Sequence, residues 1–276
     1  MIPQRNLSLL VNRLARAGRR RIPESVLERD YCLAWLLSAL AASDLRSTLA
    51  FKGGTALKCC YFGDYRSSEN LDFTLLEPTP FEDLRLGLEP VYAGVREASG
   101  IGFEFDREDR RSHADSHTFY LRYVGPLPAG GSVKVDITIR EQSVFPLEAR
   151  PVLRAYEEFA DLPAGRIVQA YSLAEIAAEK VVALADRARN EPRDLYDLWY
   201  LVCCEGMVLS RLAPAIATKL AFRNAEAAGV QEAILNKEAR LKALWSVRLA
   251  NQMSEVPPFD QVFREFRRAL RQSGLP

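Results

Sequence analysis

The sequence lacks a long apolar run and an excess of either charge. No segment approaches the roughly 20 apolar residues that a helix needs to cross a bilayer, and the first residues lack the charged-then-apolar order of a signal peptide. We therefore expect no membrane association and a cytoplasmic location. Lysine and arginine number 37 against 36 aspartate and glutamate residues, for a formal net charge of +1. This balance excludes the class of strongly basic proteins that bind nucleic acid with their whole surface.

Cysteine and histidine are also scarce. The five cysteines form an odd number and include two adjacent pairs: Cys32, Cys59, Cys60, Cys203 and Cys204. This usage is typical of reduced thiols that pack as small core residues, and it fits neither a disulfide framework nor a zinc spacing. The two histidines, His113 and His117, lie four residues apart without a third metal ligand. We expect them on the surface, in a loop.

One stretch near the N-terminus is locally basic. Between residues 10 and 23 the chain carries five arginines and no acid: Arg13, Arg16, Arg19, Arg20 and Arg21. On a helix several of them would share one face, which could bind RNA phosphates. A solvated helix face is an equally good interpretation, and both stay open.

The apolar pattern divides the chain into a mixed α/β part and a helical part. In the first part it predicts helices over residues 25–47, 55–62 and 81–99, and strands over residues 71–76, 118–124 and 132–139. A Pro- and Gly-rich link between the last two strands predicts an antiparallel hairpin. After Pro151 β-branched runs nearly vanish, and helices are predicted over residues 173–188, 194–204, 211–226, 230–249 and 259–273.

A Gly-Gly-Thr turn at residues 53–55 follows a short hydrophobic run. Its glycines, Gly53 and Gly54, let backbone N–H groups approach a phosphate, and Thr55 can add a hydroxyl at a helix N-terminus. Asn70 and Asp72 then share one face of the next strand, because side chains alternate with period two. Oxygen ligands there can hold the metal ion that neutralises a triphosphate. A tight turn without a ligand is the plainer alternative.

A third acidic position lies in the middle of a later strand. Asp136 stands between Val135 and Ile137, in a run that is otherwise apolar. Burying a carboxylate there costs free energy unless it is paired or bound to a metal ion. The alternative is an aspartate whose oxygens accept hydrogen bonds from the backbone.

The helical part contains a cluster of acids and bases. Lys180 and Arg187 recur on one helix face, while Asp194 and Asp197 are three residues apart on the next helix. One interpretation is a structural lattice of salt bridges between the helices. The other places Lys180 against a triphosphate, with Asp194 as a base or an orienting residue for the incoming hydroxyl.

Together these motifs resemble a known family, the AbiEii/AbiGii-type nucleotidyltransferase toxins, which include the MenT-type toxins of mycobacteria. They belong to the DNA polymerase β-like nucleotidyltransferase superfamily. The matching stretches are residues 52–57, 66–73, 135–137 and 180–198. The resemblance implies an α/β (α+β) fold: a helical segment over residues 1–48, a polymerase β-like core with a mixed sheet over residues 49–150, and a C-terminal helical domain over residues 151–276.

The same resemblance implies a function. It indicates a toxin of a toxin–antitoxin or abortive-infection system, with a cognate antitoxin as its partner. The toxin would use Mg²⁺ to transfer nucleotides from an NTP onto RNA, typically the 3′ end of tRNA, which blocks translation. Nucleotide transfer to a protein side chain and a catalytically silent module that binds RNA or a partner remain alternatives.

The resemblance also assigns site residues. Metal binding falls to Asn70, Asp72 and Asp136, and catalysis to these three with Lys180 and Asp194. Nucleotide binding falls to Gly53, Gly54, Thr55, Arg66, Ser68, Lys180 and Arg187. The chain departs from the family pattern at Asn70, where the family has Asp. An amide oxygen can bind Mg²⁺ but brings no charge, so we expect either an attenuated enzyme, a member that tolerates Asn, or a deliberately inactivated protein.

Overall fold

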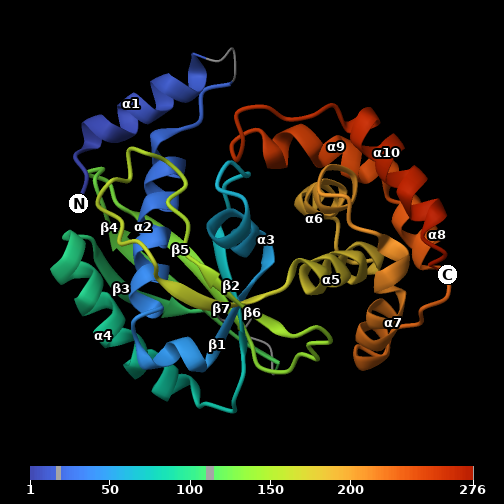
Figure 1. The fold of residues 1–276 in the computed structure, drawn as a ribbon, viewed down its shortest axis with the longest axis horizontal. Helices are drawn as coiled ribbons and strands as arrows, with labels where there is room; N and C mark the ends of the chain where they lie inside the picture. The colour runs from blue at the N-terminus through green and yellow to red at the C-terminus, as the bar shows by residue number, and fades with distance from the viewer. Residues whose placement is uncertain (17–19, 110–114, 276) are drawn as a thin grey trace. The chain divides into compact units, whose positions relative to one another are not determined.

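The computed structural model describes residues 1–16, 20–109 and 115–275 of the 276-residue chain (Figure 1). Arg19 and His113 lie outside the described residues. The chain forms two compact units. Unit 1 consists of Met1–Glu141, Leu147–Ala170 and Gln252–Ser254, and unit 2 of Gln142–Pro146, Tyr171–Asn251 and Glu255–Pro276.

Unit 1 is built on a mixed sheet, which has seven strands within the described residues and the order β3-β4-β5-β2-β1-β7-β6. The strands are β1 Leu49–Lys52, β2 Asn70–Leu75, β3 Gly102–Glu108, β4 Ser116–Val124, β5 Gly131–Thr138, β6 Leu147–Pro151 and β7 Ile167–Tyr171. β2 pairs with β5 in parallel, as β1 does with β7. The pairs β1–β2, β3–β4 and β4–β5 are antiparallel.

The described part of unit 1 also contains four helices, of which α2 and α4 cover the apolar face of this sheet. The four are α1 Gln4–Ala15, α2 Glu24–Leu40, α3 Gly53–Ala56 and α4 Phe81–Ser99, with a 3₁₀ turn at Asp44–Ser47 and a π turn at Leu57–Tyr61. Leu36 and Leu40 of α2 and Leu88 of α4 meet strand residues such as Phe73 and Ile137 in one apolar core. Burial alternates along β5, so its remaining side chains point to the opposite, polar face of the sheet.

Unit 2 is helical. Its elements are α5 Leu173–Ala185, α6 Pro192–Trp199, a π turn at Tyr200–Cys204, a 3₁₀ turn at Leu209–Leu212, α7 Ala213–Phe222, α8 Val230–Leu235, α9 Glu238–Leu249 and α10 Phe259–Gln272. The Ser172 side chain caps α5 by accepting a hydrogen bond from the Glu175 N–H. On α10, Phe263, Phe266 and Leu270 recur at helical spacing and are fully buried.

The predicted elements are largely confirmed. The helix over residues 81–99 and the antiparallel hairpin of β4 and β5 lie where the sequence predicted them. Four strands were not predicted as strands: β1, where only a short hydrophobic run was noted, and β3, β6 and β7. β7 corrects the expectation of a purely helical second half, because it lies after Pro151 and pairs in parallel with β1. A strand inside a mixed sheet need not alternate, so its five residues carry no periodic signal.

Two of the predicted helices are broken well inside their predicted ranges. The helix over residues 25–47 stops at Leu40, and the one over residues 230–249 is interrupted between α8 and α9. At that interruption the Lys237 ammonium donates to the backbone carbonyls of Asp186 and Arg189, the latter at 2.7 Å. These partners are about 50 residues away in sequence. The periodicity of residues 230–249 therefore does not predict the interruption between α8 and α9.

The scarce residue types are placed as follows. Cys32, Cys59 and Cys60 are buried free thiols, as predicted, but Cys203 and Cys204 are exposed, so the core interpretation is wrong for them. His117 lies in β4 and packs on Phe81 with ring centroids 5.0 Å apart, so the prediction of a loop is wrong for this residue.

The described residues contain no single helix that is long and apolar enough to cross a membrane. A pair bent by 120°, Pro192–Cys204 with Leu209–Phe222, meets the length and composition criteria only when the two are taken together.

Candidate active site

The Gly-Gly-Thr turn follows β1 directly, forms the first three residues of α3 and lies against β2. Gly53 has φ +75°, a left-handed conformation that favours glycine. A Cβ atom at Gly53 would stand 2.7 Å from the Asp72 Oδ2 atom, closer than side-chain atoms approach one another. The absence of a side chain therefore lets the turn backbone reach a carboxylate on the neighbouring strand.

The hydroxyl of Thr55 is engaged inside the protein. Thr55 is buried, its Oγ1 lies 2.6 Å from the Ser68 Oγ, and it also donates to the carbonyl oxygen of Asn70. These contacts fix the start of β2 against the turn. Thr55 and Ser68 thus position the strand that carries Asn70 and Asp72, while a direct contact of either hydroxyl with a phosphate stays a prediction.

A row of polar side chains crosses the sheet at one level. Lys52 of β1 pairs in register with Asp72, Asp72 pairs with Asp136 of β5, and Asp136 pairs with Thr118 of β4. We call these four residues the polar row. Directly opposed residues on neighbouring strands point to the same face. The structure therefore brings together Asp72 and Asp136, two of the three predicted metal ligands, although they are 64 positions apart in the sequence.

Asp136 is paired with neighbouring side chains, as expected for a carboxylate in an otherwise apolar strand. The Thr118 hydroxyl donates to its Oδ1 at 2.7 Å, and the Lys134 ammonium lies 2.9 Å from its Oδ2. Lys134 is also the register partner of Asn70. Sequence reasoning missed Lys134, although its place two residues before Asp136 was enough to put both side chains on one face.

Lys52, the lysine of the polar row, lies near a further acid. The Lys52 Nζ atom lies 3.9 Å from the Glu141 Oε2, and only 3% of the Glu141 side chain is exposed. Glu141 therefore adds a carboxylate next to Lys52. At the centre of the row two carboxylates, Asp72 and Asp136, are register partners, and Lys134 contacts Asp136.

This donor set fits one Mg²⁺ ion with a bound triphosphate. Mg²⁺ is commonly held by one or two carboxylates, with phosphate oxygens and waters completing its shell. Asp72 and Asp136 supply two adjacent carboxylates, and Asn70 adds an uncharged amide oxygen. Within the described residues, no group of three or more Asp, Glu, His or Cys side chains forms a complete metal site. A ligand would have to supply the remaining coordination.

Arg66, a predicted phosphate contact, is buried within unit 1. Its guanidinium donates to the Ser67 carbonyl oxygen at 3.3 Å and to the Gln252 Oε1 at 3.1 Å. The Ser67 hydroxyl donates in turn to Asp30, whose pKa is raised by its complete burial. Arg66 therefore links the segment before β2 to the loop residues around Gln252. A contact between Arg66 and a nucleotide stays a prediction.

In unit 2 the predicted acid–base cluster is an ion-pair lattice. The Lys180 ammonium lies 2.7 Å from the Asp194 Oδ1 and 2.8 Å from the Asp197 Oδ2. Arg189 adds a contact of 2.6 Å to the Asp194 Oδ2. Burial alone would raise the pKa of Asp194, but the charges of Lys180 and Arg189 outweigh it and hold that pKa well below its usual range. This arrangement agrees with the structural interpretation of the cluster.

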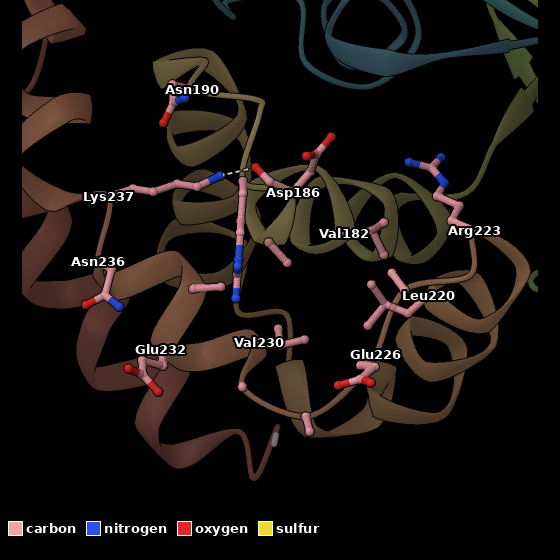
Figure 2. Close-up of a pocket in the computed structure, with 16 residues that line it drawn as sticks. Val182, Asp186, Asn190, Leu220, Arg223, Glu226, Val230, Glu232, Asn236 and Lys237 are labelled. Atoms are coloured by element: carbon pink, nitrogen blue, oxygen red, sulfur yellow. Dashed lines mark hydrogen bonds between the residues drawn. The ribbon is translucent and has the colours of Figure 1, made fainter.

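Arg187 lies elsewhere in unit 2, at the rim of a groove with a volume of about 840 Å³. Figure 2 shows the groove, with Lys237 reaching the backbone of Asp186 across one side of it. Its charged lining is mixed, since Arg187, Arg223 and Lys237 are accompanied by Asp186, Glu226 and Glu232. The nucleotide-binding role of Arg187 stays a prediction.

In the N-terminal basic stretch, Arg13 is committed to an internal ion pair. Its guanidinium contacts both carboxylate oxygens of Glu158 at 2.8 Å. Arg20 donates its backbone N–H to the Ser254 carbonyl oxygen at 2.8 Å. One of the arginines proposed to bind RNA therefore has its charge offset within unit 1.

A sequence profile described as nucleotidyl transferase AbiEii toxin, type IV toxin–antitoxin system, matches residues 35–271. The chain belongs to the AbiEii family. It is thus a nucleotidyltransferase toxin of a type IV toxin–antitoxin system, as the resemblance implied. No curated protein gives a match.

A solved structure similar to this AbiEii protein is MenT4, a nucleotidyltransferase toxin from Mycobacterium tuberculosis H37Rv. The TM-score is 0.63 at 19% sequence identity, over 95% of this chain and 87% of that chain. At this identity the likeness shows the fold alone. It confirms the predicted α/β nucleotidyltransferase fold with its mixed sheet and added helices.

The Gly53 turn of this AbiEii protein leads to a testable prediction. Replacing Gly53 by Ala is expected to strain the backbone by about 1–2 kcal/mol and to push the Asp72 carboxylate out of the polar row. Because a displacement of about 1 Å can lower a rate about 100-fold, nucleotide transfer should fall by one to two orders of magnitude. Urea unfolding and a transfer assay measure the two effects separately.

Gly165→Ala is the matched control for that substitution. Gly165 also lies in unit 1 with positive φ, +73°, but nothing stands within 4 Å of its Cβ position. It should show the loss of stability without the loss of transfer. Equal losses of transfer in the two variants would contradict the assigned contact between Gly53 and Asp72.

Proposed function

We propose that this toxin transfers nucleotides from an NTP onto an RNA acceptor, and that the acceptor is the 3′ end of tRNA. The observation that carries the proposal is the contact of the Gly53 turn with Asp72, which itself stands beside Asp136 on the sheet. A turn that presents backbone N–H groups next to two carboxylates provides donors for phosphates and ligands for their counter-ion. Blocking the acceptor end of tRNA would stop translation, which accounts for toxicity.

Asp72 and Asp136 would hold Mg²⁺, with Asn70 as a neutral third oxygen. The ion, when bound, offsets the negative charge of the triphosphate. Residues of the protein would position the triphosphate: the Gly53–Gly54 backbone would bind its phosphates, and Thr55 and Ser68 keep β2 in place. Positioning and charge stabilisation are the main demands of phosphoryl chemistry, which needs little covalent participation from the protein.

For Lys180 and Asp194 we propose a structural role, while their predicted contacts with a triphosphate and an acceptor hydroxyl stay predictions. A carboxylate whose pKa is held far below its usual range is a weak base, so Asp194 is better suited to orient its neighbours than to remove a proton. We propose that the lattice of Lys180, Asp194 and Asp197 acts by fixing the shape of its part of unit 2.

The family also implies an antitoxin partner and a nucleotide substrate. We propose that a cognate antitoxin encoded with this chain limits its activity in the cell. Expression of the chain alone should then slow growth, and the antitoxin should relieve the effect.

A silent binding module is the second candidate, because Asn70 removes one carboxylate and Lys134 neutralises part of another. Such a module would bind RNA without turnover in any metal, and restoring Asp at position 70 would not create activity. The two candidates thus predict opposite results for Asn70→Asp: a higher rate of transfer for the enzyme and no transfer for the silent module.

Incubation with each labelled NTP, Mg²⁺ and total RNA tests the proposal. On a denaturing gel we expect label from at least one NTP in a band of tRNA size that ribonuclease removes. Label in a ribonuclease-resistant protein band would instead favour transfer to a protein side chain. RNA binding without label in either band would favour the silent module.

A further inference from the structure

Lys134 places a positive charge inside the site assigned to the nucleotide. Its Nζ atom lies 2.9 Å from the Asp136 Oδ2, and its side chain is 33% exposed. Its register partner on β2 is Asn70, the position where the family has Asp. We propose that Lys134 takes the place of a second divalent cation in this chain and binds the triphosphate directly. This inference rests on the proposed function.

The charge of the site favours one divalent ion over two. Of the three predicted metal ligands only Asp72 and Asp136 are carboxylates, and the Lys134 ammonium already contacts Asp136. Two divalent ions about 4 Å apart repel each other strongly, and a two-metal site offsets that repulsion with several carboxylates. Two carboxylates, one of them shared with an ammonium, suit a single divalent ion.

The contacts of Asp136 lead to the same conclusion. Its Oδ1 accepts from Thr118 and its Oδ2 from Lys134. A second ion that used Oδ2 would have to displace the ammonium and dehydrate, and Mg²⁺ dehydrates reluctantly. An ammonium has three donors and forms charge-assisted hydrogen bonds to phosphate oxygens. Because Asn70 is neutral, no carboxylate at the paired position of β2 competes for Lys134.

The exposure of Lys134 separates this role from that of a structural counter-ion. The lysine of the lattice in unit 2, Lys180, has a side chain that is 11% exposed and contacts two acids. Lys134 contacts one acid and keeps a third of its side chain open to solvent. It can therefore hold Asp136 and reach a ligand in the same position.

Calorimetric titration of ATP, CTP, GTP and UTP tests the inference. Each nucleotide is titrated into the native protein, Lys134→Met and Lys134→Arg, once with EDTA and once with excess Mn²⁺. We expect the native protein to bind at least one NTP in EDTA, and Lys134→Met to bind it about 10- to 100-fold more weakly, as for the loss of hydrogen bonds to charged groups. Lys134→Arg should retain most of the metal-free affinity.

With Mn²⁺ the difference should shrink, because the ion can then use the Asp136 oxygen that Lys134 vacates. The dependence of affinity on metal is thus steeper in Lys134→Met than in the native protein, a change that a purely structural lysine would not produce. Equal metal dependence in the two proteins, with NTP bound by both in Mn²⁺, would overturn the inference and leave the proposed function standing. Failure of every NTP to bind in Mn²⁺ would overturn both.

Discussion

Replacing Asn70 by Asp is expected to raise the rate of nucleotide transfer to RNA about 100- to 1,000-fold. Asn70 shares the polar face with Asp72, and its amide contributes an oxygen without charge. A carboxylate there would add a third negative group to Asp72 and Asp136. It would also stand opposite Lys134 in the sheet register and draw the ammonium from Asp136, which frees an oxygen for the metal ion. Single-turnover incorporation of labelled NTP into RNA measures the change.

Asn12→Asp is the control for the added charge. Asn12 is an exposed residue of α1 in unit 1, so the same chemical change there should leave the rate as it was. An Asn70→Asp rate no higher than that of the native chain would show that the missing carboxylate does not limit the reaction. The silent-module alternative would then be preferred.

Replacing Lys180 by Met is expected to lower the free energy of unfolding by about 3–5 kcal/mol. The Lys180 ammonium contacts Asp194 and Asp197, whose side chains are 2% and 0% exposed. Its removal leaves two buried carboxylates close together, although Arg189 still contacts Asp194. Urea unfolding followed by circular dichroism measures the loss. A Lys180 variant without activity is therefore no evidence of phosphate contact until its folding has been measured.

Lys242→Met provides the comparison within unit 2. Lys242 forms an ion pair of 2.6 Å with Asp260, but the two side chains are 55% and 69% exposed. Water screens such a pair, so its loss should cost no more than about 1 kcal/mol. If Lys180→Met is as stable as Lys242→Met, the lattice is not the structural element described here, and a ligand-binding role for Lys180 gains support.

Local patterns in the sequence were sufficient for the turn and the strand that follows it. A positive φ at Gly53 and alternation along β2 are properties of consecutive residues, so Asn70 and Asp72 were placed on one face correctly. The helix over residues 259–273 was predicted for the same reason, because helical spacing is a property of nearby residues.

Contacts that depend on the register between neighbouring strands could not be predicted from the sequence. The sequence showed that Asp136 required a partner, but the choice of Lys134 and Thr118 follows from the pairing of β5 with β4 and β2. β7 lies beyond Pro151 in the sequence and pairs with β1 in the sheet. This pairing is a long-range contact, so the periodicity of the five residues of β7 does not predict it. Likewise, the sequence left two interpretations of the cluster in unit 2 open. The distances from Lys180 to two buried acids agree with the structural interpretation, and they depend on the packing of α5 against α6, which no local pattern gives.

The most direct test of the account compares single-turnover transfer to RNA by the Asn70→Asp protein with that of the same protein carrying Asp72→Asn. Asp72 is the carboxylate that contacts the Gly53 turn and adjoins Asp136. We predict that the second substitution lowers transfer at least about 100-fold while both proteins unfold at similar urea concentrations. Undiminished transfer without the Asp72 carboxylate would contradict the assignment of the polar face as the site of the reaction.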